Sequence, residues 1–294
     1  MSVKFFSIFT LFFVISCSTT VNRAPANLVD IDSCKASIKS FFKDFKDKRI
    51  TGLHDSQILK TKLIPLSKRE ELSIEIELKT ASIRRDITDD LPKTGTTNPH
   101  LLELVGGIKA VWKPHQKVKL SNYRAEVLAY ELDQILDLKL VPPTVERVIN
   151  DEHGSLQLFE EAISGPLLIF NKNQKMTKEA IERVDHELRK QSFFDYLIQN
   201  GDRHKGNFLF TLDGRVISID NGSSFTGHGF NMKSFEVRKS DIQSFIQTDE
   251  GKKVLKKLRS INNDKFKEEI EGYLGKSDTL TFFDRIEVIL NLKK

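Results

Sequence analysis

Residues 200–222 contain two short polar turns at the two ends of an apolar hairpin. The first turn reads Asn-Gly-Asp-Arg-His-Lys-Gly-Asn and contains Asp202 and Asn207, and the second, Asp-Asn-Gly, begins at Asp220. Between them, two apolar runs flank an Asp-Gly pair at 213–214, which favours a tight reversal of the chain. We therefore expect the two turns to lie side by side and to form one polar site.

Three side chains of these turns suit phosphoryl transfer. The reaction needs a carboxylate that orients and deprotonates the acceptor, together with oxygen ligands that hold a divalent cation on the phosphates. Asp202 can be that carboxylate, and Asn207 and Asp220 can bind Mg²⁺ or Mn²⁺. Each turn also has a plain structural interpretation, as a buried Asp-Arg pair or as an ordinary Asp-Asn-Gly turn. Their joint occurrence, Asp-x4-Asn followed by Ile-Asp-Asn-Gly, favours the catalytic interpretation.

The composition is that of a globular protein. The chain has 294 residues, of which 39% are hydrophobic and 30% charged, and its formal net charge is +5. This length allows one large domain or two lobes that share a cleft. The Lys-rich run at 252–257 has apolar residues at helical spacing, so it fits a solvated helix face better than a nucleic-acid patch. No His residues have the spacing of a zinc motif, which argues against a zinc site.

The N-terminus has the pattern of an export signal. Lys4 precedes an apolar stretch over 5–15 that is too short to span a bilayer as an ordinary helix. It ends in Val-Ile-Ser-Cys, which resembles the lipobox of bacterial lipoproteins, where cleavage precedes the Cys and the Cys is lipidated. We therefore expect a signal peptide over 1–16, lipidation of Cys17 and a linker over 17–32. An uncleaved anchor or a misassigned start of translation are the alternatives.

This signal predicts a location and a redox property. Ser18, directly after Cys17, fits passage of a lipoprotein to the outer membrane, so we expect a lipid-anchored protein of the bacterial cell envelope, periplasmic or surface-exposed. With Cys17 acylated, Cys34 is the only remaining thiol. No intrachain disulfide is then expected.

An N-terminal extension is predicted over 33–90. Within it, 33–48 has apolar residues at helical spacing and is expected to form an amphipathic helix on the main body. At 73–79, Ile74, Ile76 and Leu78 alternate with polar residues, which predicts a half-buried strand.

The rest of the chain divides into a β-rich part over 91–160 and a helical part over 161–294. The first part is expected to contain a hairpin with a Gly-Gly turn at 101–112, a helix at 121–137 capped by Ser121, and strands at 144–149 and 155–159. The second is expected to contain helices at 177–197, 249–261, 263–274 and 280–292. The predicted fold class is α+β, with a small antiparallel lobe, a mainly helical lobe and the acidic turns at their junction.

A lysine and a glutamate upstream complete the expected site. Lys113 ends the second strand of the hairpin, where its ammonium can meet nucleotide phosphates, and Glu126 on the following helix can hold it there. Glu131 is the competing partner.

Several stretches resemble bacterial members of the phosphatidylinositol 3-/4-kinase-like superfamily, and also the HipA-type and secretory-pathway casein kinases. They are Arg-Ala-Glu-Val-Leu-Ala-Tyr-Glu-Leu at 124–132, Leu-Lys-Leu-Val-Pro-Pro-Thr at 138–144, Gly-Ser-Leu-Gln-Leu-Phe at 154–159, and the two polar turns. The resemblance covers about 91–225 and implies a bilobed protein-kinase-like fold. Asp-Arg-His reverses the order of ordinary protein kinases, so the loop is of the atypical type.

The resemblance implies roles for individual residues. Lys113 matches the nucleotide-binding lysine, Glu126 its partner, Asp202 the catalytic aspartate, and Asn207 and Asp220 the metal ligands. Arg203 is expected to pair with a carboxylate, and His204 to order the loop or approach the phosphate. The main chain at Leu158, Phe159 and Glu160 matches the hinge that binds adenine. Gly95, in Gly-Thr-Thr, is either a phosphate-covering turn or only a loop.

The sequence thus predicts an ATP-dependent phosphotransferase that uses Mg²⁺ or Mn²⁺, with Ser or Thr of a protein as the acceptor. One alternative is a non-catalytic nucleotide-binding or interaction module anchored to the outer membrane, because ATP is scarce beyond the inner membrane. A second is a lipid or small-molecule kinase, since similarity of fold does not fix the acceptor. The expected partners are a nucleotide, an unidentified acceptor and the membrane, but not nucleic acid.

Overall fold

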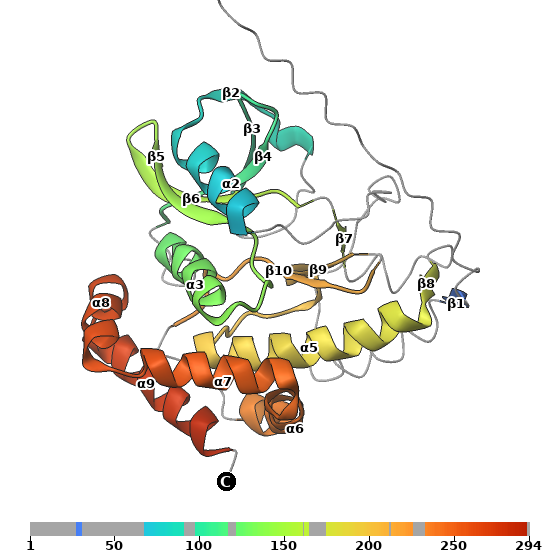
Figure 1. Cartoon of the computed structure of the whole chain (residues 1–294). Helices are drawn as coiled ribbons and strands as arrows, with labels where there is room; N and C mark the ends of the chain where they lie inside the picture. Colours follow the sequence, from blue (N-terminus) through green and yellow to red (C-terminus); the bar gives the residue numbers. More distant parts are fainter. Residues whose placement is uncertain are drawn as a thin grey trace, which may run out of the picture.

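A five-stranded sheet and a group of helices occupy opposite ends of the molecule, with helix α3 (Tyr123–Leu136) between them (Figure 1). The structure is a computed structural model that describes residues 28–30, 68–90, 98–116, 122–160, 162–164, 175–211, 213–225 and 233–292. It confirms the predicted α+β fold class, with an antiparallel sheet in the N-terminal part and a mainly helical C-terminal part. Outside the described residues lie the signal over 1–16, lipidation of Cys17, the helix at 33–48, the Ser121 cap and the turn with Gly95.

The small lobe is built on an antiparallel sheet with strand order β2-β3-β4-β6-β5. The strands are β2 (Ile83–Asp86), β3 (His100–Leu104), β4 (Lys109–Pro114), β5 (Thr144–Ile149) and β6 (Glu152–Leu158). The hairpin of β3 and β4 confirms the prediction from Gly-Gly, because Gly106 and Gly107 have φ angles of 112° and 90°. In β4, Lys113 pairs with Ser155 of β6, which fixes its place at the end of the sheet.

The strand predicted at 73–79 is wrong, because these residues lie in helix α2 (Lys68–Thr80). Ile74 and Leu78 are four residues apart and both pack in the apolar cluster of the small lobe, whereas Ile76 is 53% exposed. The alternation in the sequence therefore reflected an apolar helix face plus one exposed Ile. Arg147 of β5 stabilises the helix end by donating to the carbonyls of Leu78 and Ala81, at 2.7 and 2.6 Å.

Both α2 and β2 come from 33–90, the segment that the sequence set apart as an extension. In the structure β2 pairs with β3, and α2 packs against β5 and β6. A short turn of 3-10 helix (Thr88–Asp90) follows β2. The small lobe as described therefore includes residues from 68 onward.

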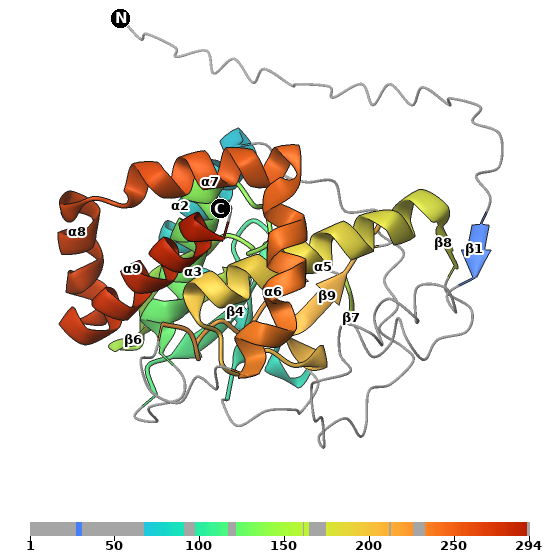
Figure 2. The same ribbon diagram turned by 90° about the horizontal axis from the view of Figure 1, so that it is seen from below.

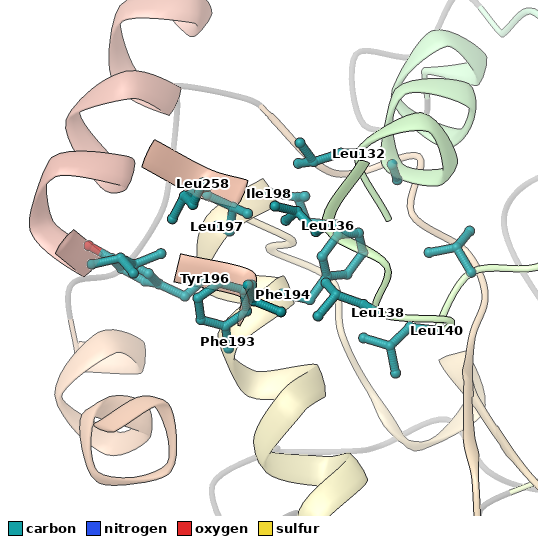
Figure 3. Packing of buried hydrophobic residues seen from close by; sticks show 14 of the residues in the cluster. Leu132, Leu136, Leu138, Leu140, Phe193, Phe194, Tyr196, Leu197, Ile198 and Leu258 are labelled. Atoms are coloured by element: carbon teal, nitrogen blue, oxygen red, sulfur yellow. The ribbon is translucent and has the colours of Figure 1, made fainter. Parts of the chain in front are cut away.

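Helix α3 joins the two lobes. Its N-cap is Asn122, whose side chain accepts from the N–H of Arg124 at 2.9 Å, whereas Ser121, the predicted cap, lies outside the described residues. The helix contacts β5 and β6 of the small lobe. Its far end and the residues after it pack on the large lobe in one apolar cluster, in which Leu132, Leu136, Leu138 and Leu140 meet Phe193, Phe194, Leu197, Ile198 and Leu258 (Figure 3).

The large lobe surrounds the long helix α5 (Lys178–Ile198), on which α6 and α9 pack (Figure 2). After α5 come β9 (Phe208–Phe210) and β10 (Val216–Ser218), which with β7 (Ile163–Ser164) form a three-stranded sheet. The remaining elements are α6 (Lys233–Gln247), α7 (Asp249–Ile261), α8 (Asp264–Leu274), α9 (Lys276–Asn291), and the paired strands β1 (Leu28–Asp30) and β8 (Lys175–Thr177). None of the described helices is long and apolar enough to cross a membrane.

The sequence predicted α7 with its observed bounds, whereas α6 was not predicted and α9 begins four residues before the predicted start at 280. The α9 start lacks a side-chain cap, because Gly275 stands at the N-cap position. The polar first turn of α9, Lys-Ser-Asp-Thr, therefore gave no start signal.

Candidate active site

Lys113 lies at the junction of the lobes and contacts two carboxylates. Its Nζ donates to Oε1 of Glu126 at 2.5 Å and to Oδ1 of Asp220 at 2.9 Å. The Lys113 side chain is 14% exposed and that of Glu126 is 2% exposed. Glu131, the competing partner, lies on the exposed side of α3. The structure therefore pairs Lys113 with Glu126, as predicted, and adds Asp220 to the pair.

Glu126 also contacts the loop that contains Asp220. Its second oxygen, Oε2, accepts from the N–H of Asn221 at 2.9 Å. A neighbouring backbone bond joins the same two segments, since the N–H of Asn122 donates to the carbonyl of Gly222 at 2.9 Å. Glu126 thus connects the lysine of the sheet to the loop of the large lobe.

The charges of these three side chains affect the ionisation of Lys113 and of Asp220. Burial by itself would lower the pKa of the Lys113 ammonium, but the charges of Asp220 and Glu126 outweigh burial and raise it above its ordinary value. The charge of Lys113 in turn lowers the pKa of Asp220, against the opposing effect of burial. At neutral pH the lysine is therefore protonated and Asp220 is ionised.

Asp202 lies on an exposed loop whose backbone is held by two amides. Its N–H donates to Oδ1 of Asn200 at 3.0 Å, and its carbonyl accepts from Nδ2 of Asn207 at 3.0 Å. The Asp202 residue itself is exposed, whereas Asn200 and Asn207 are buried. The loop therefore presents a carboxylate to solvent from a fixed backbone, as a base for an incoming acceptor requires.

Asn207 and Asp220 lie on adjacent segments and fit a hard divalent cation. The N–H of Ile219 donates to the carbonyl of Asn207 at 3.3 Å, which holds the two segments together. Because Nδ2 of Asn207 is bonded to Asp202, the side-chain oxygen is the atom left to bind a metal. Asp220 is 39% exposed and has a left-handed φ of 58°, an uncommon conformation that turns this residue out of the strand direction.

An amide oxygen with a carboxylate is a ligand set for Mg²⁺ or Mn²⁺ rather than for zinc. Within the described ranges, no three His, Cys, Asp or Glu side chains gather as a metal-binding group.

His204 supports its own loop through a hydrogen bond to the backbone. Its Nδ1 accepts from the N–H of Gly206 at 3.1 Å, which caps the short 3-10 turn Lys205–Asn207. Of the two roles expected for His204, this contact favours ordering of the loop.

Sequence reasoning assigned no role to several buried polar residues beside the site. Arg203 is paired with Asp195 of α5, as expected of a neighbouring carboxylate, but Asn200, Asn221 and Gln191 also belong to this network. Gln191 and Asp195 are four residues apart in an otherwise apolar end of α5. That spacing is the one sequence signal that could have indicated a polar contact there.

The N–H groups of Leu158 and Phe159 in the expected hinge already donate to carbonyls of the protein itself. The N–H of Leu158 donates to the carbonyl of Pro143 at 2.8 Å, and that of Phe159 to the carbonyl of Lys109 at 2.9 Å. Adenine bound here would therefore contact carbonyl groups or the main chain from Glu160 onward. Gly95 lies outside the described residues, so its contact with a phosphate stays a prediction.

One small pocket lies beside the expected hinge, against the loop that precedes β5. It is lined by Glu71, Lys139, Leu140, Val141, Pro142, Pro143, Glu160, Arg215 and Ile217. Lys113, Asp202, Asn207 and Asp220 do not line it, so this pocket is not the charged site.

The sequence profile of the family described as phosphatidylinositol 3- and 4-kinase matches residues 115–270, just over half of the chain. The chain belongs to the phosphatidylinositol 3- and 4-kinase family. Inside the matched segment lie Glu126, Asp202, Asn207 and Asp220, and Lys113 lies two residues before it.

The fold of this phosphatidylinositol 3- and 4-kinase family member is similar to a solved structure described as "Crystal structure of the golgi casein kinase". The TM-score is 0.52 and the identity 13%, and the match covers 90% of this chain and 86% of that chain. At this identity the similarity shows the bilobed kinase-like fold alone. A comparison with curated protein sequences finds no significant match.

Proposed function

We propose that this protein is an ATP-dependent phosphotransferase in which Asp202 is the catalytic base and Asn207 and Asp220 bind Mg²⁺ or Mn²⁺. The observation that carries the proposal is the contact of Lys113 with both Glu126 and Asp220. This contact brings together residues from a strand, a helix and a loop of the other lobe, in the arrangement that phosphoryl transfer requires.

The chain's own residues have separate tasks. Lys113 keeps its proton and is held by Glu126 at the junction of the lobes, where it can bind the phosphates of a nucleotide. Asp202 is exposed, so an acceptor hydroxyl can reach it and transfer its proton to the carboxylate. A bound Mg²⁺ or Mn²⁺ would neutralise charge that develops on the phosphates.

The acceptor class rests on resemblance. We infer a Ser or Thr hydroxyl of a protein, since HipA-type and secretory-pathway kinases are the relatives that the loop motifs resemble. An exposed Asp202 suits a macromolecular acceptor, because the base need not be reached through a closed pocket. A lipid or small-molecule hydroxyl would use the same proton transfer.

The lipobox at Cys17 supports a location in the bacterial cell envelope, anchored by lipid to the outer membrane. The nucleotide would then come from outside the cytoplasm of the producing cell. A non-catalytic module would bind a nucleotide without transferring its phosphoryl group. Measuring binding and transfer separately therefore distinguishes this module from the phosphotransferase.

The test is transfer of label from ATP or GTP with Mg²⁺ or Mn²⁺, using the full chain in detergent and candidate protein, lipid and small-molecule acceptors. Asp202→Asn should reduce transfer roughly 10²- to 10⁴-fold, the usual contribution of a general base. Asp264→Asn, which removes the same charge on exposed α8, should have no effect. Nucleotide binding without transfer would favour the non-catalytic module, and absence of nucleotide binding would contradict the proposal.

A further inference from the structure

We propose that Arg203 is a positioning residue that sets the spacing between the two segments with the metal ligands Asn207 and Asp220. The inference rests on the proposed function, because it assigns a role toward the metal of that site. It concerns a side chain that is 0% exposed and therefore cannot touch a substrate.

One nitrogen of Arg203 joins the two segments directly. Nη1 donates to the carbonyl of Asn207 at 2.9 Å and to the carbonyl of Ile219 at 2.5 Å. Asn207 is itself one expected ligand, and Ile219 immediately precedes the other. A change in the position of this nitrogen would therefore change the separation of both ligands.

The other two nitrogens of the guanidinium are held by three side chains. Nε donates to Oδ1 of Asp195 at 3.0 Å, and Nη2 donates to Oγ of Ser218 at 2.7 Å and to Oδ1 of Asn221, the residue after Asp220, at 2.5 Å. With the two bonds of Nη1, every one of the five N–H groups has an acceptor. The Phe208 ring also packs against the cation, 5.1 Å from its centroid to Cζ.

A purely structural ion pair would need only the charge of Arg203 opposite Asp195. Here, however, the bonds toward the loops require a planar fork that can reach two carbonyls, a hydroxyl and an amide at once. Lysine has a single nitrogen on a flexible stem and cannot reproduce this fork. The Arg203→Lys variant therefore keeps a cation for Asp195 while losing the link between the Asn207 and Ile219 carbonyls.

The experiment titrates Mn²⁺ into the full chain with ATP present and follows the loss of the free Mn²⁺ signal by electron paramagnetic resonance, relative to the same titration of ATP without protein, because ATP itself binds Mn²⁺. Metal-free ATP binding is measured separately by calorimetry. Arg203→Lys should raise the Mn²⁺ concentration for half-saturation roughly 10- to 100-fold, as loss of an outer partner of a metal ligand typically does. Metal-free ATP binding should stay unchanged, because the Lys113–Glu126 pair is untouched.

Arg285→Lys is the matched control. Arg285 is also buried, but its bonds go to the Leu197 carbonyl and the Gln199 side chain, not to the metal-bearing segments. It should lower the melting temperature and leave the Mn²⁺ requirement unchanged. If Arg203 contributed to stability alone, Arg203→Lys would also lower the melting temperature and leave the Mn²⁺ requirement unchanged.

An unchanged Mn²⁺ requirement in folded Arg203→Lys would overturn the proposal. An equal loss of ATP binding without and with Mn²⁺ would overturn it as well. If circular dichroism shows that this variant does not fold, Ser218→Ala removes one acceptor of the fork and should raise the requirement several-fold; no increase there overturns the proposal. Failure of the unmodified chain to bind Mn²⁺ and ATP would instead overturn the proposed function, and with it this role.

Discussion

Replacing Asp133 with asparagine should stabilise the protein at pH 8 and change its stability little at pH 4. The Asp133 side chain on α3 is fully buried. Its Oδ1 accepts from the N–H of Leu140 at 3.0 Å, whereas its Oδ2 has no hydrogen-bond partner among the described residues. Burial raises the pKa of this carboxyl from 3.8 to about 7, against the opposing effect of the backbone bonds.

The sign of the effect follows from proton binding. Between pH 3.8 and about 7 the unfolded chain has lost the Asp133 proton and the folded chain keeps it, so this group makes stability fall as pH rises. At 1.36 kcal/mol for each pH unit, the loss over this interval is at most about 4 kcal/mol. Asparagine resembles the protonated acid and does not ionise, so Asp133→Asn should gain roughly 2–4 kcal/mol over the natural chain at pH 8.

The measurement is urea unfolding of both proteins at pH 4, 6 and 8. Asp137→Asn removes an exposed carboxylate at the end of the same helix and should change stability by less than about 0.5 kcal/mol at each pH. If the difference between Asp133→Asn and the natural chain did not grow from pH 4 to pH 8, the buried carboxyl would not be the titrating group and the reasoning would fail.

Two further substitutions test the cleft and the sheet. Lys113→Met should cost about 3 kcal/mol because Glu126 is left buried without its cation, and in thermal-shift assays it should abolish stabilisation by ATP and Mn²⁺. Adding Glu126→Gln should recover much of the stability but not the ATP effect, and a recovered ATP effect would contradict the role of Lys113. Gly154→Ala should destabilise the protein by about 1–3 kcal/mol, because the added Cβ would lie 2.4 Å from the Lys113 carbonyl and 2.5 Å from the Trp112 ring. Gly272→Ala, in an open stretch of α8, should instead gain roughly 0.5–1 kcal/mol, and equal effects of the two changes in chemical denaturation would refute the steric argument.

Local patterns predicted those parts of the fold whose stabilising contacts are also local. Helix α7 has Thr248 at its N-cap and an apolar face with helical spacing, and its predicted bounds match the observed ones. In α2 the pattern was ambiguous, because Ile74, Ile76 and Leu78 satisfy a period of two. The bonds from Arg147 to the end of α2 come from a strand far along the sequence, and no local pattern contains that information.

In the candidate site, too, the contacts between lobes and between distant segments could not be predicted from local sequence patterns. The spacing of Lys113 and Glu126 made them only candidate partners, and the resemblance to the kinase superfamily selected Glu126 over Glu131. The second bond of Lys113, to Asp220, depends on how the two lobes meet. The five acceptors of Arg203 depend on the packing of α5 against both loops, which the sequence alone does not specify.

The bond between Lys113 and Asp220 has a consequence for how ligands enter. The ammonium of Lys113 is an internal counterion for two carboxylates, so it offsets part of the negative charge of the candidate site. If the chain binds a metal nucleotide as proposed, Lys113 would hold the phosphates and Asp220 the metal, so that binding would exchange one set of ion pairs for another. The occupancy of the site would then depend on ionic strength.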